Sequence, residues 1–212
     1  MIKIIKQSFA LGVVLALGAC VSLLPTSGDL NPRLGLSAGM PSTSKDMTPK
    51  YDASLTIADV NSAAVYNSFN VAIATAPYQY EYLSGAEWTD RVPVLVRRFI
   101  EQRFENEYIF EAVGDRTELP IATYELQTDI RAFHLDRTNG QEIAKVILSF
   151  RLKTAKGRIL GSKVFFEETQ PTDKTAPARA EALNRSASTV VNRAMEWVDA
   201  RVAQDRQSTE MR

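Results

Sequence analysis

Three runs of alternating polar and apolar residues follow one another in YELQTDIRAFHLDRTNGQEIAKVILSFRLKTAKGRILGSKVFFEE, residues 124–168. In each run the apolar side chains recur with a period of two, which places them on one face of a β-strand. Asn139-Gly140 and Lys156-Gly157 separate the runs, and such dipeptides are typical of hairpin turns. The stretch therefore predicts a three-stranded antiparallel meander with one apolar and one polar face.

Two amphipathic helices are predicted outside this stretch. The first begins after Trp88, where Thr89 or Asp90 could cap it, and the second runs from about Pro177 to Val202. Both carry apolar stripes with helical spacing, namely Val92, Leu95, Val96, Phe99 and Ile100 in the first and Leu183, Ala187, Val190, Ala194 and Trp197 in the second. We therefore predict an α+β fold of two layers, a mostly antiparallel sheet with a meander, covered on one face by two helices.

Short apolar segments at 55–58 and 70–74 predict two further strands. After them, Tyr78, Tyr80 and Tyr82 alternate with polar residues, so three phenols are expected on one face of an extended segment. We favour a half-buried strand whose rings cover the core, because aromatic residues suit strands without any ligand. The alternative is an aromatic contact surface for a partner or lipid, formed by these tyrosines together with Trp88.

Composition narrows the possible functions. The 212 residues are 45% hydrophobic and 24% charged, which suits one globular domain with a full core. Because 25 Lys and Arg residues balance 25 Asp and Glu residues, we expect no nucleic acid partner. One cysteine and one histidine are too few for zinc sites, disulfide frameworks or most catalytic triads. We accordingly predict a protein that is not an enzyme and uses no cofactor or metal.

Two apparent catalytic features are discounted. Residues 35–39 match the G-x-S-x-G pattern of serine hydrolases around Ser37, but no strand and helix are predicted on either side. The only available base, His134, is interpreted as a surface or strand-end histidine. A hydrolase that uses Ser37 remains a minor alternative.

The N-terminus carries the most specific motif of the chain. Lys3 and Lys6 precede an apolar run that ends in Leu17-Gly18-Ala19-Cys20, and this run is shorter than the roughly 20 residues needed to span a bilayer. The pattern resembles a bacterial lipoprotein signal, which implies cleavage after residue 19 and acylation of Cys20. Because Val21, and not Asp, follows the cysteine, we expect the outer membrane rather than the inner membrane.

Four segments are expected along the chain. A signal peptide covers residues 1–19, and the lipidated Cys20 begins a flexible tether rich in Pro, Gly and Ser that extends to residue 50. No packed element is expected in this tether, because proline removes amide donors and glycine is costly to order. The folded periplasmic domain is expected over 51–203, and a polar tail that frays over 204–212.

The domain also resembles a known family. The residues that carry the resemblance are Tyr82-Leu83-x-Gly85-Ala86-x-Trp88-Thr89-Asp90-Arg91-x-Pro93, Phe104-Glu105, Phe110-x-Ala112-Val113 and Tyr124-Glu125-Leu126-x-Thr128-Asp129-Ile130-Arg131-x-Phe133. They are similar to the ABC-type transport auxiliary lipoprotein component family, over about residues 55–197. These motifs are structural and assign no catalytic residue.

The resemblance implies a periplasmic lipoprotein that works beside an ABC permease, its ATPase and an MCE-domain protein, which together move lipids between the two membranes of a Gram-negative cell. Of the residues here, it assigns a role only to Cys20, as the lipidation site. We expect a docking or bridging component at the outer membrane, and leave a homo-oligomer open. The alternative is a lipid-binding carrier that holds an acyl chain between helices and sheet.

Overall fold

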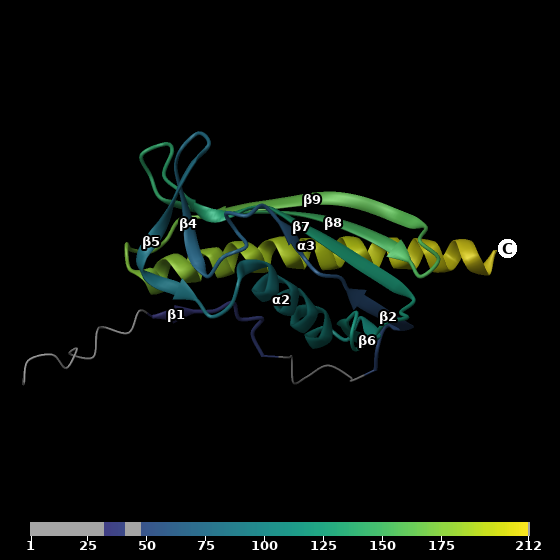
Figure 1. The fold of residues 1–212 in the computed structure, drawn as a ribbon. Helices are drawn as coiled ribbons and strands as arrows, with labels where there is room; N and C mark the ends of the chain where they lie inside the picture. The colour runs from purple at the N-terminus through teal and green to yellow at the C-terminus, as the bar shows by residue number, and fades with distance from the viewer. Residues whose placement is uncertain (1–31, 41–47, 212) are drawn as a thin grey trace, which may run out of the picture. The chain divides into compact units, whose positions relative to one another are not determined.

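The computed structural model describes residues 32–40 and 48–211. In sequence order these residues form β1 (Arg33–Leu34), β2 (Tyr51–Ile57), β3 (Asn61–Ser62), β4 (Asn70–Ala76), β5 (Gln79–Trp88), α2 (Val92–Asn106), β6 (Phe110–Asp115), β7 (Tyr124–Asp136), β8 (Ile143–Thr154), β9 (Ile159–Thr169) and α3 (Ala176–Glu210). The nine strands of the described part belong to one sheet, with both helices on the same side of it (Figure 1). The predicted α+β class is confirmed.

Strand β7 is the centre of this sheet. Along one edge it pairs antiparallel with β8, which pairs antiparallel with β9, so the predicted meander is confirmed. Along its other edge β7 pairs in parallel with three short strands, β2, β3 and β4. The sheet is therefore mixed, with its long pairings antiparallel and its short ones parallel. Alternating polarity indicates which face a residue occupies but not the direction of the neighbouring strand.

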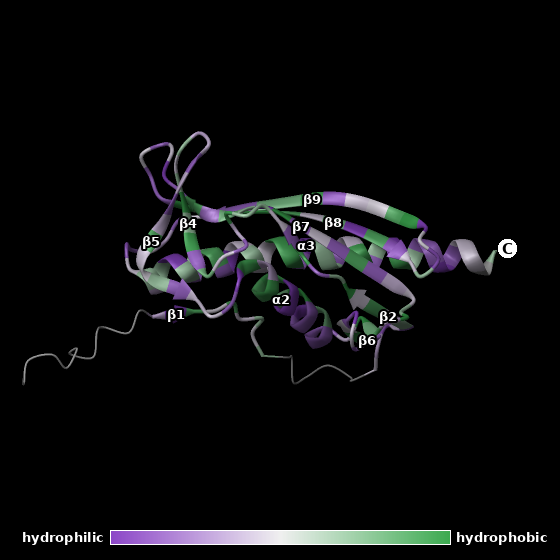
Figure 2. Cartoon of the chain, viewed as in Figure 1, coloured by the Kyte–Doolittle hydropathy of each residue, from purple (hydrophilic) through white to green (hydrophobic). Residues whose placement is uncertain are grey.

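The core lies between the sheet and the helices. The predicted stripes of both helices are buried, and α3 packs its stripe against β8 and β9. Trp197 of α3 contacts Phe165 edge to face, with ring centroids 6.4 Å apart, and Phe165 contacts Phe150 at 6.1 Å. Hydrophilic and hydrophobic residues alternate in bands along β7, β8 and β9 (Figure 2), because only one face of these strands meets the helices.

The end of α3 differs from the predicted fraying tail. The helix continues to Glu210, with Val202 fully buried and Asp205 only 9% exposed. The Tyr124 hydroxyl donates a hydrogen bond of 3.2 Å to Asp205 Oδ2, and Arg158 forms an ion pair with the same carboxylate. A polar tail sequence thus remains helical because the sheet supplies partners for its carboxylate.

Helix α2 also begins differently from the prediction. Its N-cap is Arg91, which makes no side-chain capping bond, rather than Thr89 or Asp90. The Asp90 carboxylate instead accepts a hydrogen bond of 2.7 Å from the Arg91 amide.

Residues 32–40 are packed, although a tether without any packed element was predicted here. β1 pairs in parallel with the end of β5, and Leu34 and Ala38 are buried. The Ser37 amide donates to Asn184 Oδ1 (3.0 Å), and Arg103 Nη1 donates to the Ala38 carbonyl (3.0 Å). The edge of β5 and side chains from both helices supply hydrogen-bond partners for the backbone N–H and C=O groups of residues 32–40. These partners are distant in sequence, so the local composition did not predict them. The rest of the predicted tether, at 20–31 and 41–47, lies outside the described residues.

In the described part of the chain, neither helix has the length and hydrophobicity required to cross a bilayer. The predicted signal peptide and Cys20 lie outside the described residues.

Trp88→Ala is expected to lower the free energy of unfolding by about 3–5 kcal/mol, because a fully buried indole leaves a large cavity. Tyr82→Ala, on the same strand but with a side chain about half exposed, is the matched control and is expected to cost under about 1 kcal/mol. Urea unfolding measures both values, and equal losses would contradict the assignment of Trp88 to the core.

Candidate interaction surface

Among the described residues, the structure brings together no group of three His, Cys, Asp or Glu side chains that could hold a metal ion. The Ser37 hydroxyl accepts a hydrogen bond of 3.4 Å from the Gly39 amide, and residues 38–40, the described residues directly after Ser37, are not helical. His134, the base that a hydrolase would need, is bonded to Tyr66 in the sheet. The short strand β1 ends just before the match, but the described residues directly after Ser37 do not begin the helix on which a nucleophile elbow depends.

Trp88 was predicted as part of an aromatic surface, and this is wrong. Its side chain is 1% exposed and meets Phe133 edge to face at 5.9 Å. The cause is a break in the alternation of β5, where Gly85 adopts a φ of 76° and the register with β4 shifts. Tyr80 and Tyr82, before the break, are exposed, whereas Trp88, after it, points into the core.

The interpretation that the three rings cover the core is wrong for Tyr78, whereas Tyr80 covers the buried Tyr66–His134 pair. Tyr80 and Tyr82 are 45% and 47% exposed on β5, and their partners across the hairpin are the small residues Ala74 and Ala72. Tyr78 is fully exposed and lies in the turn before β5, with a φ of 66°. We call these three residues, at the end of the β4–β5 hairpin, the tyrosine tip.

A buried aromatic cluster supports the base of the tyrosine tip. Tyr66 Oη lies 2.8 Å from His134 Nδ1, and the two rings stack with centroids 5.9 Å apart. The Tyr80 ring stands nearly perpendicular to both, at 6.3 Å from Tyr66 and 5.6 Å from His134. The tip is thus fastened to the sheet by contacts from a loop, a hairpin and β7.

His134 lies near the end of β7, as predicted for a strand-end histidine, but its side chain is 5% exposed and is not at the surface. Burial lowers the pKa of this imidazole, with a further lowering from Lys145 that is opposed by Asp136 and Glu168. Burial also raises the pKa of Tyr66. The lowered pKa favours the neutral imidazole at pH 7, and its Nδ1 shares a hydrogen bond with the Tyr66 hydroxyl. Tyr66, the hydrogen-bond partner of His134, lies in the loop before β4 and is 68 residues away in sequence. No local sequence pattern predicts this contact.

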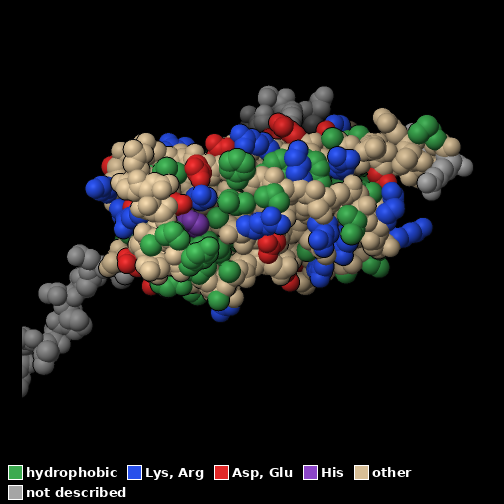
Figure 3. All heavy atoms as spheres, turned by 90° about the horizontal axis from the view of Figure 1, so that it is seen from above, with side chains coloured by type: hydrophobic (Ala, Val, Ile, Leu, Met, Phe, Trp, Pro, Cys, Tyr) green, Lys and Arg blue, Asp and Glu red, His purple; other side chains and the backbone are tan. Residues whose placement is uncertain are grey.

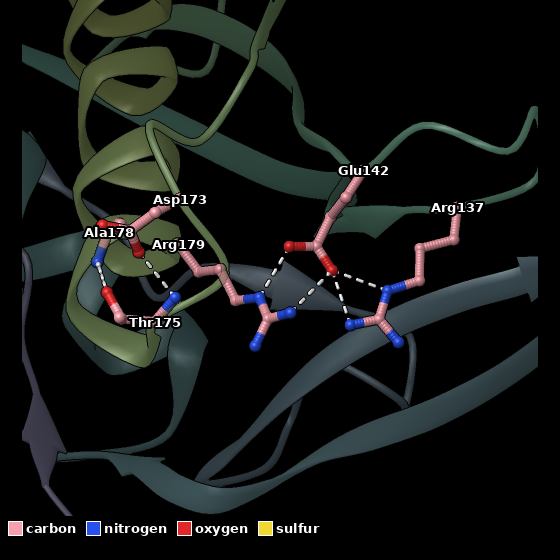
Figure 4. Close-up of polar contacts among 6 residues, drawn as sticks. All are labelled: Arg137, Glu142, Asp173, Thr175, Ala178 and Arg179. Atoms are coloured by element: carbon pink, nitrogen blue, oxygen red, sulfur yellow. Dashed lines mark hydrogen bonds and ion pairs between the residues drawn. The ribbon is translucent and has the colours of Figure 1, made fainter.

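An ion-pair network ties the β7–β8 loop to the start of α3 (Figure 4). Glu142 accepts hydrogen bonds of 2.6 Å from Arg137 Nε and of 2.6 Å from Arg179 Nε. The Arg137 amide also donates to the Ala74 carbonyl at 2.9 Å, which links the network to the β4–β5 hairpin. Thr175 caps α3 through a hydrogen bond from the Ala178 amide. The hairpin, loop and helix are therefore connected at one end of the sheet.

The outer face of the sheet, away from the helices, mixes exposed apolar and basic side chains (Figure 3). Val164 and Phe166 of β9 are 41% and 64% exposed. Beside them, Arg151 Nε donates to Ser162 Oγ at 3.3 Å, and Arg131 Nη2 donates to Ser149 Oγ at 3.3 Å. Arg131 also forms an ion pair with Asp129 at 3.9 Å, and both side chains of this pair are more than half exposed.

A cleft of about 760 Å³ opens between the end of α2 and α3. Its lining mixes apolar side chains with charged ones, including the Lys50–Asp199 ion pair (2.6 Å) and Arg103, which donates to Asn192 Oδ1 at 2.5 Å. An acyl chain needs an apolar cavity, so this cleft does not favour the lipid-carrier alternative.

The fold and these motifs are those of a known class of bacterial lipoproteins. Residues 35–194 match the family model of the ABC-type transport auxiliary lipoprotein component, and the chain belongs to this family. The resemblance inferred from the sequence motifs is thereby confirmed.

Individual solved structures share the fold of this chain, but none of these relatives assigns a function to it. The crystal structure of protein XCC0632 from Xanthomonas campestris is 20% identical with a TM-score of 0.70, and the match covers 83% of this chain and 98% of that one. The hypothetical protein CT253 from Chlamydia trachomatis is 6% identical with a TM-score of 0.50, over 72% and 98% of the two chains. An uncharacterized protein of Bradyrhizobium diazoefficiens is 34% identical over 95 residues, which span 45% of this chain and a quarter (25%) of that relative.

Glu142→Gln is expected to lower the free energy of unfolding by about 1–3 kcal/mol at pH 7, because Arg179 and Glu142 are only 12% and 14% exposed. The two arginines lower the pKa of Glu142 against the effect of burial. Its contribution is thus present above the pKa of the unfolded state and is lost as pH falls through the folded pKa. Urea unfolding measured from pH 7 to pH 3 should show the unfolding free energies of the wild type and Glu142→Gln becoming equal at low pH.

The matched control for this change is Glu181→Gln. Glu181 pairs with Arg185 at 3.3 Å, but their side chains are 60% and 44% exposed, so a loss of no more than about 0.5 kcal/mol is expected. A loss at Glu142 no larger than this would contradict a structural role of the network.

The pH dependence of stability near neutrality should come from His134. Because its folded pKa is lowered, its contribution is complete above the unfolded pKa of about 6.5 and falls as pH drops through that value towards the folded pKa. The wild type should therefore lose stability from pH 7 to pH 5, and His134→Gln should lose less. Unfolding midpoints across this range measure the difference, and parallel curves would refute the assignment.

Proposed function

We propose that this protein is a lipid-anchored periplasmic auxiliary component of an MCE-linked ABC-type system that moves lipids between the two membranes of a Gram-negative cell. It docks or bridges that system to the outer membrane. The family match over residues 35–194 carries the proposal, because the family is defined by association with ABC-type transport and by lipidation.

Two features of the chain support this role. The Leu17-Gly18-Ala19-Cys20 motif supplies the lipid anchor, and attachment by two or three acyl chains is durable where a single chain holds only weakly. The outer sheet face presents aromatic, aliphatic and basic groups at its surface, which suits contact with a partner. The role is contact rather than catalysis, with the permease, the ATPase and the MCE-domain protein as partners.

The anchoring role is tested at Cys20. Cys20→Ser is expected to abolish incorporation of radiolabelled palmitate, to release the protein from the outer membrane fraction and to reproduce the lipid-transport defect of a deletion. Ser22→Ala is the matched control and should behave as the wild type. Full transport by an unlipidated Cys20→Ser protein would rule out the anchoring role.

The choice of membrane is tested separately. An Asp directly after the lipidated cysteine is the usual retention signal for the inner membrane, so Val21→Asp should keep the acyl chains but move the protein. If docking at the outer membrane is required, this variant loses transport while it still incorporates palmitate. Normal transport from the inner membrane would contradict the bridging role.

The partners are tested by purification. The lipidated protein is expected to co-purify with the permease, the ATPase or the MCE-domain protein from detergent extracts. Stoichiometric lipid bound to the purified domain by mass spectrometry, with no co-purifying component, would instead favour a lipid carrier.

A further inference from the structure

The β4–β5 hairpin carries three exposed phenols, of which Tyr80 packs on the Tyr66–His134 pair while Tyr78 is fully exposed. We propose that the tyrosine tip, Tyr78, Tyr80 and Tyr82, rests in the headgroup region of the bilayer that holds the acylated Cys20. This inference rests on the proposed lipid anchor and adds a second, non-covalent contact between the domain and the membrane. The partner that the tyrosine tip contacts is a lipid surface.

The chemistry of the tip suits that occupant. A tyrosine ring presents an apolar body and a polar hydroxyl, and such side chains are enriched where hydrocarbon meets water. From Asn70 to Trp88 the chain contains no Lys or Arg, and Glu81 is the one charged residue between the tyrosines. A contact of this kind depends on aromatic burial at the interface and not on attraction to anionic lipids.

The backbone at Tyr78 gives an independent indication. Its φ of 66° lies in the left-handed region, which non-glycine residues rarely adopt, and its side chain is fully exposed. A large ring held in a disfavoured conformation gains nothing from packing within the domain. Such a position is typical of a residue that is retained for an external contact.

The tip is also preorganised. Tyr80 packs against the Tyr66–His134 pair, and the Ala74 carbonyl of the same hairpin accepts a hydrogen bond from the Arg137 amide. In Figure 1 the loop between β4 and β5 projects away from both helices, beside the loop between β7 and β8. Because the hairpin is already held in one conformation, it loses little conformational entropy when it binds a surface.

The covalent connection allows the tip to reach the membrane. The chain from Cys20 enters the domain on β5 itself, since the Pro32 carbonyl accepts a hydrogen bond of 3.2 Å from the Glu87 amide. The residues between Cys20 and Pro32 span at most about 40 Å when extended. β5, with ten residues, extends about 33 Å from this point to the tip. The tether is therefore long enough for the acyl chains and the tyrosine tip to occupy the same bilayer surface.

The test places a fluorescent reporter at the tip. Tyr78→Trp and, as a second reporter, Tyr82→Trp are made in the full-length lipidated protein and reconstituted into phosphatidylethanolamine and phosphatidylglycerol vesicles. Half of the vesicles contain phosphatidylcholine brominated near the glycerol end of its acyl chains. The native Trp88 and Trp197 are 1% and 8% exposed, so the wild type supplies the background signal. Ile159→Trp is the matched control, because Ile159 is 59% exposed at the turn between β8 and β9, the opposite end of the meander.

The expected result is a loss of fluorescence in brominated vesicles for the two tip reporters, beyond the wild-type background, and none for Ile159→Trp. The loss should persist at high salt and without phosphatidylglycerol. Protein that floats with the vesicles but shows no quenching at the tip, or quenching only at position 159 or only with anionic lipid, overturns the tip contact and leaves the anchor intact. Protein that fails to float contradicts the anchor and the tip contact together. Urea unfolding midpoints equal to the wild type show that each reporter variant is folded.

Discussion

Burial of the apolar stripe of α3 against β7, β8 and β9 is the interaction on which the remainder of the domain depends. Phe150, Phe165 and Trp197 form a continuous chain of edge-to-face contacts across this interface. Burial of each such side chain contributes about 1.5–3 kcal/mol, so even a few of them are comparable with the net stability of a domain. Gly161 of β9 belongs to the same interface, because a Cβ there would lie 3.1 Å from Trp197.

This one-sided packing has a direct consequence for function. Two helices cover one face of the sheet, so the opposite face of the meander is left without a second layer and presents Val164, Phe166 and several basic residues. The same long strands place the β4–β5 hairpin beyond the covered part of the sheet, where its tyrosines meet no helix. This arrangement leaves apolar and basic side chains available to a partner, and the chain belongs to a transport auxiliary family.

Residues 32–40, part of the predicted tether, are more structured than their composition indicates. Residues 32–40 contain Pro, Gly and Ser, yet they add a strand to the edge of β5 and receive hydrogen bonds from Arg103 and Asn106 of α2. The covalent link to Cys20 therefore begins at a defined point of the sheet.

Periodicity alone predicted the meander, both helices and their buried stripes, because apolar residues at periods of two and about 3.6 have one stable arrangement, with the apolar faces together. It did not predict the parallel pairing of β2, β3 and β4 with β7, nor the length of α3, whose polar end is held by Tyr124 and Arg158. The family motifs were likewise readable from the chain.

The side chains of the candidate surface show what the sequence pattern could not predict, namely which of them are exposed. The alternation of the tyrosines was visible in the sequence, but the bulge at Gly85 decided that Tyr80 and Tyr82 face outward while Trp88 faces the core. His134 became a buried partner of Tyr66 only through a contact 68 residues away in sequence. Local patterns determine which side chains share a face, whereas the pairing of distant segments determines which of those faces stay in water.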